Sequence, residues 1–214
     1  MKHSFTTQNN CTCTRATQKT ILIWIVSFFA LTAVELFLLS VVSLIPRSAI
    51  QKHTQESAVY FMKRPVFYRV LENDPASNID HYADAILLNV LYYYDAEHPF
   101  ASPLKASYYY TSTHNENTNL YTAVTSDAEP TYDYFRYWHG SAVLIRPLLT
   151  IFNIQQIYIV FAIVLAGLLA ALVTMLAKSG YAFCIWGILT ALISVSFWYI
   201  PMSLEYIWCF LIML

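Results

Sequence analysis

Two aspartates four residues apart are the strongest candidates for chemistry in this 214-residue sequence. Asp80 and Asp84 open a segment that is typical of a helix continuing to about Tyr94, and their spacing puts both carboxylates on one helical face. Leu87 and Leu91 extend the same stripe, so the two acids would face a packed or lipid-adjacent surface. Burial and a second carboxylate both raise the pKa of an acid. The pattern therefore suits a general base or a pair of ligands for a divalent cation.

The same segment also allows a purely structural interpretation. Ser77 or Asn78 could cap this helix, and Asp80 would then be a first-turn acid that the helix dipole stabilises. Asp84 would pack against neighbouring side chains with no role in chemistry. The sequence alone leaves both interpretations open.

A cluster of basic and aromatic residues precedes the point where the chain becomes strongly apolar again. Arg136, Trp138 and His139 lie in the run Arg-Tyr-Trp-His-Gly, and Arg146 follows shortly afterwards. Arginine binds phosphate through paired hydrogen bonds and keeps its charge at an apolar boundary, while tryptophan favours the headgroup region of a membrane. The cluster predicts a site for a lipid-linked phosphate or diphosphate. The alternative is ordinary contact with lipid headgroups.

Several other classes of site lack the residues that they need. No glycine occurs before Gly140, and a phosphate-binding loop or a dinucleotide fold needs glycines where the backbone meets phosphate. Residues 46–140 hold seven Lys and Arg against eleven Asp and Glu, which argues against a nucleic-acid partner. Cys11 and Cys13 form a lone CxC pair, which is a weak metal signal and is also typical of a disordered tail.

Long apolar segments predict an integral membrane protein. The sequence is 57% hydrophobic and 12% charged, whereas about 25% of the residues of a soluble domain are charged. Residues 20–45 contain one charge, Glu35, and residues 154–177 and 181–200 contain none. About 20 apolar residues in a helix cross the hydrocarbon core of a bilayer, so each segment is long enough. An acid in mid-span usually faces other helices, which is the interpretation of Glu35.

Basic residues at the ends of these segments predict the topology. Arg15 and Lys19 precede the first span, and Lys178 lies in the turn between the second and the third. Cytoplasmic loops carry an excess of Lys and Arg. Residues 1–19 are therefore predicted to form a cytoplasmic tail, residues 46–140 an extracytoplasmic domain, and the whole chain a multi-pass protein of the cell membrane.

The predicted fold is mainly α-helical, a polytopic helical bundle whose large first extracytoplasmic loop is an α or α+β domain. Pro147 and the polar run after it separate an interfacial helix, residues 141–153, from a transmembrane helix, residues 154–177. Residues 181–200 are predicted to form the third span, and residues 203–214 to begin a fourth. A helix as short as this last one reaches only about half of a bilayer. We therefore expect the sequence to be the N-terminal part of a longer protein.

Tyrosine is concentrated in the predicted extracytoplasmic domain. This segment holds thirteen of the seventeen tyrosines, including triplets at 92–94 and 108–110. A ring with an apolar body and a polar tip suits a membrane interface or a carbohydrate-facing cleft. The alternative is packing in the core of a small domain.

The layout resembles that of the GT-C polytopic glycosyltransferases, which have one helix, a large first outside loop with acidic residues, interfacial helices and further spans. Two segments within residues 78–214 look like those of uncharacterised bacterial multi-pass proteins linked to surface-polysaccharide production. They are Asp80-x-x-x-Asp84-x-x-x-Leu88-Asn89 and Arg136-Tyr137-Trp138-His139-Gly140 with Arg146-Pro147-Leu148-Leu149.

This resemblance implies transfer of a sugar from a polyprenyl-phosphate donor, with Asp80 or Asp84 as the base or a metal contact. The implied partners are membrane lipid, the lipid-linked sugar and the remaining helices of the full-length chain. The residues implied in substrate binding are Arg136, Trp138, His139, Arg146 and Asn89. The alternative function is that of a non-catalytic membrane subunit or transporter fragment in an envelope assembly.

Overall fold

The computed structural model describes residues 5–112, 115–126, 128–136 and 139–214, and of residues 5–18 and 76 it describes the backbone alone. The described chain is mainly helical. Its α-helices are α1 (Phe5–Ser43), α2 (Arg47–Met62), α3 (His81–Tyr92), α4 (Ala101–Lys105), α5 (Glu116–Thr125), α6 (Ala142–Leu148), α7 (Ile154–Lys178), α8 (Ala182–Ser194) and α9 (Leu204–Met213). Its remaining elements are the 3-10 helices η1 (Pro75–Ser77) and η2 (Phe197–Met202) and two antiparallel ribbons, β1 (Phe67–Arg69) with β2 (Asn78–Asp80) and β3 (Ser107–Tyr108) with β4 (Tyr132–Asp133).

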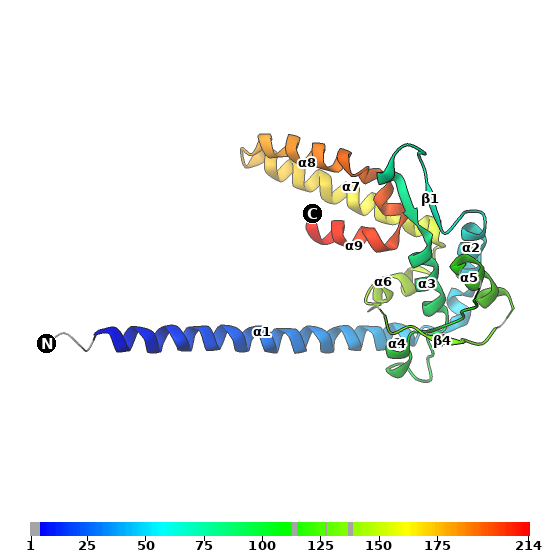
Figure 1. Cartoon of the computed structure of the whole chain (residues 1–214), viewed down its shortest axis with the longest axis horizontal. Coiled ribbons are helices and arrows are strands. Elements are labelled where there is room, and N and C mark those ends of the chain that lie inside the picture. Colours follow the sequence, from blue (N-terminus) through cyan, green and yellow to red (C-terminus); the bar gives the residue numbers. More distant parts are fainter. Residues whose placement is uncertain (1–4, 113–114, 127, 137–138) are drawn as a thin grey trace.

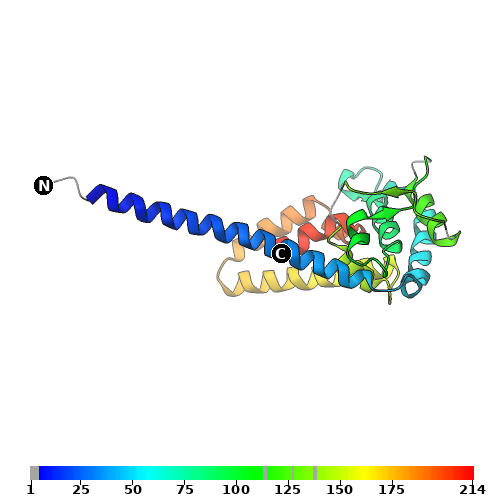
Figure 2. The same cartoon turned by 90° about the horizontal axis from the view of Figure 1, so that it is seen from below.

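The elements form a head domain, residues 47–148, from which long helices extend. Figure 1 shows α1 and the α7–α8 hairpin leaving the head domain toward the same side, and Figure 2 shows the same arrangement from a perpendicular direction. The N-terminal end of α1 and the turn between α7 and α8 both lie away from the head domain (Figure 1). The helix α9 starts beside the head domain and runs back along the same direction.

Two helical stretches of the described chain are long and apolar enough to cross a membrane. They are Lys19–Ser43 within α1 and Ile154–Lys178, which is α7, with mean hydropathies of 2.4 and 2.9. None of the most apolar stretch of α1 is buried against protein, and only 11% of that of α7 is buried. Helices that are apolar on every side suit a hydrocarbon environment.

The third predicted span, residues 181–200, is divided in the structure. The helix α8 ends after 13 residues, which corresponds to about 20 Å of helix and is shorter than the hydrocarbon core of a bilayer. Ser196 adopts a left-handed conformation with φ of 49°, and its hydroxyl donates to the Asp74 carboxylate of the head domain at 2.8 Å. The apolar composition predicted one helix, and a polar contact with a distant part of the chain interrupts it.

The start of α7 is fixed by hydrogen bonds from its own residues and from the head domain. The Asn153 side chain accepts from the Gln156 backbone N–H at 3.2 Å, and the Gln156 side chain accepts from the Asn153 backbone N–H at 3.0 Å. This reciprocal pair is a capping box. The Ser57 hydroxyl of α2 accepts from the Ile154 N–H at 2.9 Å. These contacts set where α7 leaves the head domain.

Arg146 in α6 joins the head domain to α1. Its side chain is fully buried, and its guanidinium donates to the carbonyls of Leu91 and Tyr94 at the end of α3 and of Ile45 just after α1. Carbonyls at helix C-termini lack intrahelical donors and attract a cation. Burial lowers the pKa of Arg146 to about 10, so the guanidinium stays charged at neutral pH.

The core of the head domain lies among α2, α3 and α5. Its fully buried side chains include those of Ile50, Phe61, Leu88 and Leu120. All three tyrosines of the triplet at 92–94 are buried, whereas only Tyr108 of the triplet at 108–110 is buried. The first triplet therefore packs in the core, while the second reaches the surface.

Candidate functional site

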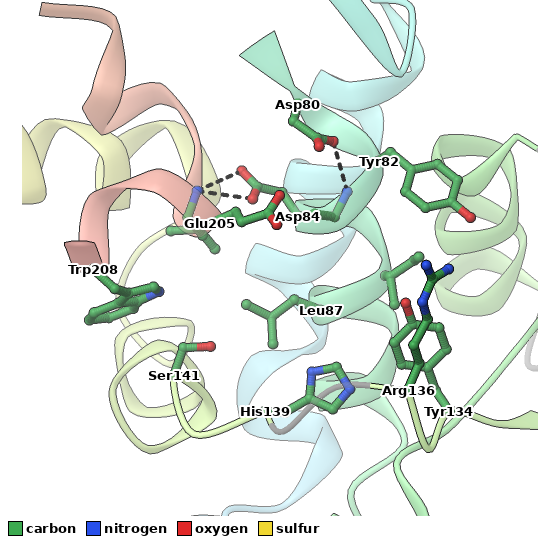
Figure 3. Close-up of a pocket in the computed structure, with 13 residues that line it drawn as sticks. Asp80, Tyr82, Asp84, Leu87, Tyr134, Arg136, His139, Ser141, Glu205 and Trp208 are labelled. Carbon is green, nitrogen blue, oxygen red and sulfur yellow. Dashed lines mark hydrogen bonds between the residues drawn. The ribbon is translucent and has the colours of Figure 1, made fainter. Parts of the chain in front are cut away.

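A cavity of about 360 Å³ lies where the head domain meets the apolar helices. Figure 3 shows its walls, which are the first turns of α3, the first turns of α9 and the segment that precedes α6. The polar and aromatic residues that line it are Asp80, Tyr82, Asp84, Tyr134, Arg136, His139, Ser141, Glu205 and Trp208. The structure thus brings together both predicted acids and two of the predicted basic residues.

Asp80 is the N-cap of α3. The expected helix start at Ser77 or Asn78 is displaced, because Asn78–Asp80 pairs with Phe67–Arg69 as a strand before the helix begins. The Asp80 carboxylate accepts from the Ala83 N–H at 3.0 Å. Its side chain also faces the cavity (Figure 3), so capping does not remove it from the site.

Asp84 is almost completely buried, and its carboxyl group joins three helices. It accepts from the Tyr158 hydroxyl of α7 at 2.5 Å and from the Leu204 N–H of α9 at 2.9 and 3.1 Å. Burial raises the pKa of Asp84 to about 8, although both hydrogen bonds oppose this change. Asp84 is therefore mainly neutral at pH 7. It also caps α9, whose N-cap residue Ser203 makes no capping bond through its own side chain.

Glu205 is a third acid of the site, and the sequence marked it only as a first-turn residue of α9. Its side chain lines the same cavity as that of Asp80, and the two lie close enough for their charges to interact. Two carboxyl groups, one from α3 and one from α9, therefore face the cavity together. The sequence signal was an acid at the start of an apolar helix, but its partner was not visible.

The opposite wall carries the basic residues. Arg136 is exposed, and its guanidinium lies beside Tyr82 and Tyr134 in Figure 3. The His139 ring lies 5.5 Å from that of Tyr134, centroid to centroid. Burial lowers the pKa of His139 to about 4, so the imidazole is neutral at pH 7. Its Nε2 is buried and has no hydrogen-bond partner among the described residues.

Two of the residues predicted to bind substrate, Arg146 and Asn89, do not line the cavity. Arg146 is buried, and its guanidinium donates to three backbone carbonyls near the ends of α3 and α1. Asn89 is buried, and its amide holds the backbone N–H and carbonyl of Tyr109 at 3.1 and 2.9 Å. Trp138 lies outside the described residues. The positions of Arg146 and Asn89 in the sequence could not show whether each side chain binds the protein backbone or a ligand.

The predicted divalent cation has no complete site in the part of the chain that the structure describes. No group of three or more His, Cys, Asp or Glu side chains there could hold a metal ion. Both Asp84 oxygens already accept hydrogen bonds from Tyr158 and Leu204.

Comparisons of this chain with protein-family models, with curated proteins and with solved structures found no match.

Proposed function

We propose that this chain is part of a multi-pass membrane glycosyltransferase of the GT-C type, which transfers a sugar from a polyprenyl-phosphate donor during surface-polysaccharide assembly. The observation that carries the proposal is the cavity. It sets an acid pair, Asp80 and Glu205, opposite the guanidinium of Arg136 and the neutral imidazole of His139. Sugar transfer from a phosphate needs a base for the incoming hydroxyl and a cation for the departing phosphate.

The position of the cavity supports a lipid-linked substrate. Leu204, Glu205 and Trp208 of its lining belong to α9, an apolar helix. The exposed apolar surfaces of α1 and α7 extend from the same side of the head domain (Figure 1). A molecule with a hydrocarbon tail and a phosphate head would therefore reach the cavity from the bilayer with its tail still in hydrocarbon.

The residues of the cavity divide the reaction as follows. An acceptor hydroxyl attacks the anomeric carbon of the donor sugar, and its proton passes to the carboxylate of Asp80 or of Glu205. The bond between the anomeric carbon and the phosphate oxygen breaks, and the phosphate leaves with the electron pair. Arg136 neutralises the charge that develops on the phosphate. The His139 ring forms part of the wall beside the substrate, and Asp84 holds α9 in place without exchanging protons.

The decisive experiment compares single variants of the acid pair in protein reconstituted in nanodiscs with a radiolabelled polyprenyl-phosphate sugar. Asparagine caps helices as well as aspartate does, so Asp80→Asn keeps the start of α3 intact while removing the base. We expect Asp80→Asn and Glu205→Gln to lower turnover by about 10²- to 10⁴-fold, the range of general-base catalysis. The matched control is Asp95→Asn, which changes an exposed acid outside the cavity.

Wild-type turnover by both variants would overturn the proposed acid pair. If the wild-type protein shows no turnover and both variants support normal polymer assembly in cells, the chain acts as a non-catalytic membrane subunit instead.

A further inference from the structure

Four tyrosines on and beside the β3–β4 ribbon form a connected cluster of rings, which we name the tyrosine ribbon: Tyr108, Tyr110, Tyr132 and Tyr134. The Tyr108 centroid lies 6.0, 5.9 and 5.6 Å from those of Tyr110, Tyr132 and Tyr134, and the Tyr110 and Tyr132 centroids are 6.0 Å apart. Edge-to-face and tilted pairs at these separations are favourable. The cluster therefore has a defined shape.

The tyrosine ribbon runs from the core to solvent and ends at the candidate site. Tyr108 is 4% exposed and Tyr132 is 56% exposed. Tyr134 lines the cavity and contacts the His139 ring at 5.5 Å. Core packing alone explains Tyr108, but it leaves the exposed ring of Tyr132 without a role.

The backbone under the tyrosine ribbon is held firmly for so short a sheet. The Tyr110 N–H donates to the Thr131 hydroxyl at 2.9 Å, and the Thr131 hydroxyl donates back to the Tyr110 carbonyl at 2.7 Å. The Ser107 hydroxyl donates to the Asp133 carboxylate at 2.5 Å. These bonds hold the rings in position before any ligand arrives, which lowers the entropic cost of binding.

We propose that the tyrosine ribbon is a subsite for the sugar units of a neutral oligosaccharide that continues beyond the reacting unit. This inference rests on the proposed function and names the acceptor of the same site as a glycan chain. A tyrosine ring offers an apolar face to the C–H groups of a pyranose and a hydroxyl to its polar edge, and it loses little conformational entropy on binding.

The size of the cavity agrees with binding of the reacting sugar inside it and of further sugar units on the tyrosine ribbon. Its volume of about 360 Å³ is near the lower end of the range for small-molecule sites, about 300–1,000 Å³. Further sugar units must therefore lie outside it, and the tyrosine ribbon begins where Tyr134 leaves its wall.

The test measures binding and requires no turnover. Protein in nanodiscs is titrated with tetrasaccharides of glucose, galactose, mannose, rhamnose and N-acetylglucosamine, and saturation-transfer NMR reports contact with each. We expect at least one tetrasaccharide to bind, and Tyr132→Ala to weaken it about tenfold, the change that 1.4 kcal/mol produces. Tyr132→Trp keeps an aromatic face and should bind as wild type does, which separates stacking from folding. Tyr121→Ala, which removes another exposed tyrosine, is the control and should have no effect.

Three outcomes would overturn the subsite: no tetrasaccharide binds, Tyr132→Ala and Tyr121→Ala bind equally, or Tyr132→Trp fails as Tyr132→Ala does. A fourth is that Tyr132→Ala changes only the depth of the head domain in the bilayer, measured by lipid quenching, which would make the cluster a headgroup contact. Binding that depends on Tyr132 in a protein without turnover would refute the proposed function and leave the subsite standing. If turnover is lost in Asp80→Asn and unchanged in Tyr132→Ala, and no tetrasaccharide binds, the subsite is refuted and the proposed function stands.

Discussion

Asp84 lies where α3, α7 and α9 meet, and its surroundings favour the neutral acid. Burial raises the pKa of this carboxyl group from 3.8 to about 8. The folded protein therefore binds the Asp84 proton more tightly than the unfolded chain does between these two values. Stability falls with rising pH wherever the folded state binds more protons. The contribution of Asp84 is thus fully present below about pH 4 and is lost as the pH rises toward 8.

Replacing Asp84 with asparagine should remove this pH dependence. The amide oxygen of Asp84→Asn can accept from the Tyr158 hydroxyl and the Leu204 N–H as the carboxyl group does, and it does not titrate. We expect the thermal midpoint of the wild type in detergent to fall between about pH 4 and pH 8, and that of Asp84→Asn to fall less. Parallel curves for the two proteins would show that Asp84 is not the titrating group. Asp84→Ala, which leaves the buried Leu204 N–H unpaired, should lower stability by about 1–3 kcal/mol below about pH 4, where the contribution of Asp84 is fully present.

At the scale of the elements, the sequence identified the apolar helices and missed their interruptions. The polar run at 153–156 and the apolar run after it predicted the start of α7, because these signals are local. The break after α8 coincides with the hydrogen bond from Ser196 to Asp74, which are 122 residues apart. The cap of α9 comes from Asp84, 120 residues before Leu204. Periodicity and composition cannot predict such contacts, since they are formed only in the folded chain.

The candidate site was predictable to a similar extent. Asp80 and Asp84 were found from their spacing, and Arg136 and His139 from their residue types near an apolar boundary. Glu205 was missed as a site residue, because its partner Asp80 belongs to another element. Arg146 was assigned to the same site as Arg136, although it is buried and Arg136 is exposed. One sequence gives no measure of burial for two arginines in similar surroundings.

The two arginines should therefore respond differently to substitution by lysine. In Arg146→Lys, one ammonium replaces a planar fork that serves three carbonyls, and each buried carbonyl left unpaired costs about 1–3 kcal/mol. We expect Arg146→Lys to lower the folded fraction, measured by size-exclusion chromatography in detergent, while turnover per folded molecule stays near wild type. Arg136→Lys should leave the folded fraction unchanged and lower turnover per folded molecule, because the Arg136 side chain is exposed and faces the cavity. Equal loss of folded protein in both would contradict this division.

The whole molecule has one polar end and one apolar end, which makes its orientation in a membrane testable. Lys178 lies at the far end of the α7–α8 hairpin, on the side to which α1 extends (Figure 1). In cells that express a variant without its natural cysteines, we expect an impermeant thiol reagent to label a cysteine at Ser112, in the head domain. A cysteine at Ser179, beside Lys178, should be labelled only after the cells are permeabilised. Labelling of Ser179 and protection of Ser112 would reverse the proposed topology.

The hydrogen bonds of Arg146 have a mechanical consequence. One guanidinium holds the carbonyl that follows α1 and two carbonyls at the end of α3, so the two helices cannot rotate independently at this point. A membrane helix adjusts to the thickness of its bilayer by changing its tilt. A change in the direction of α1 would therefore act on the C-terminal end of α3, the helix whose opposite end carries Asp80 and Asp84.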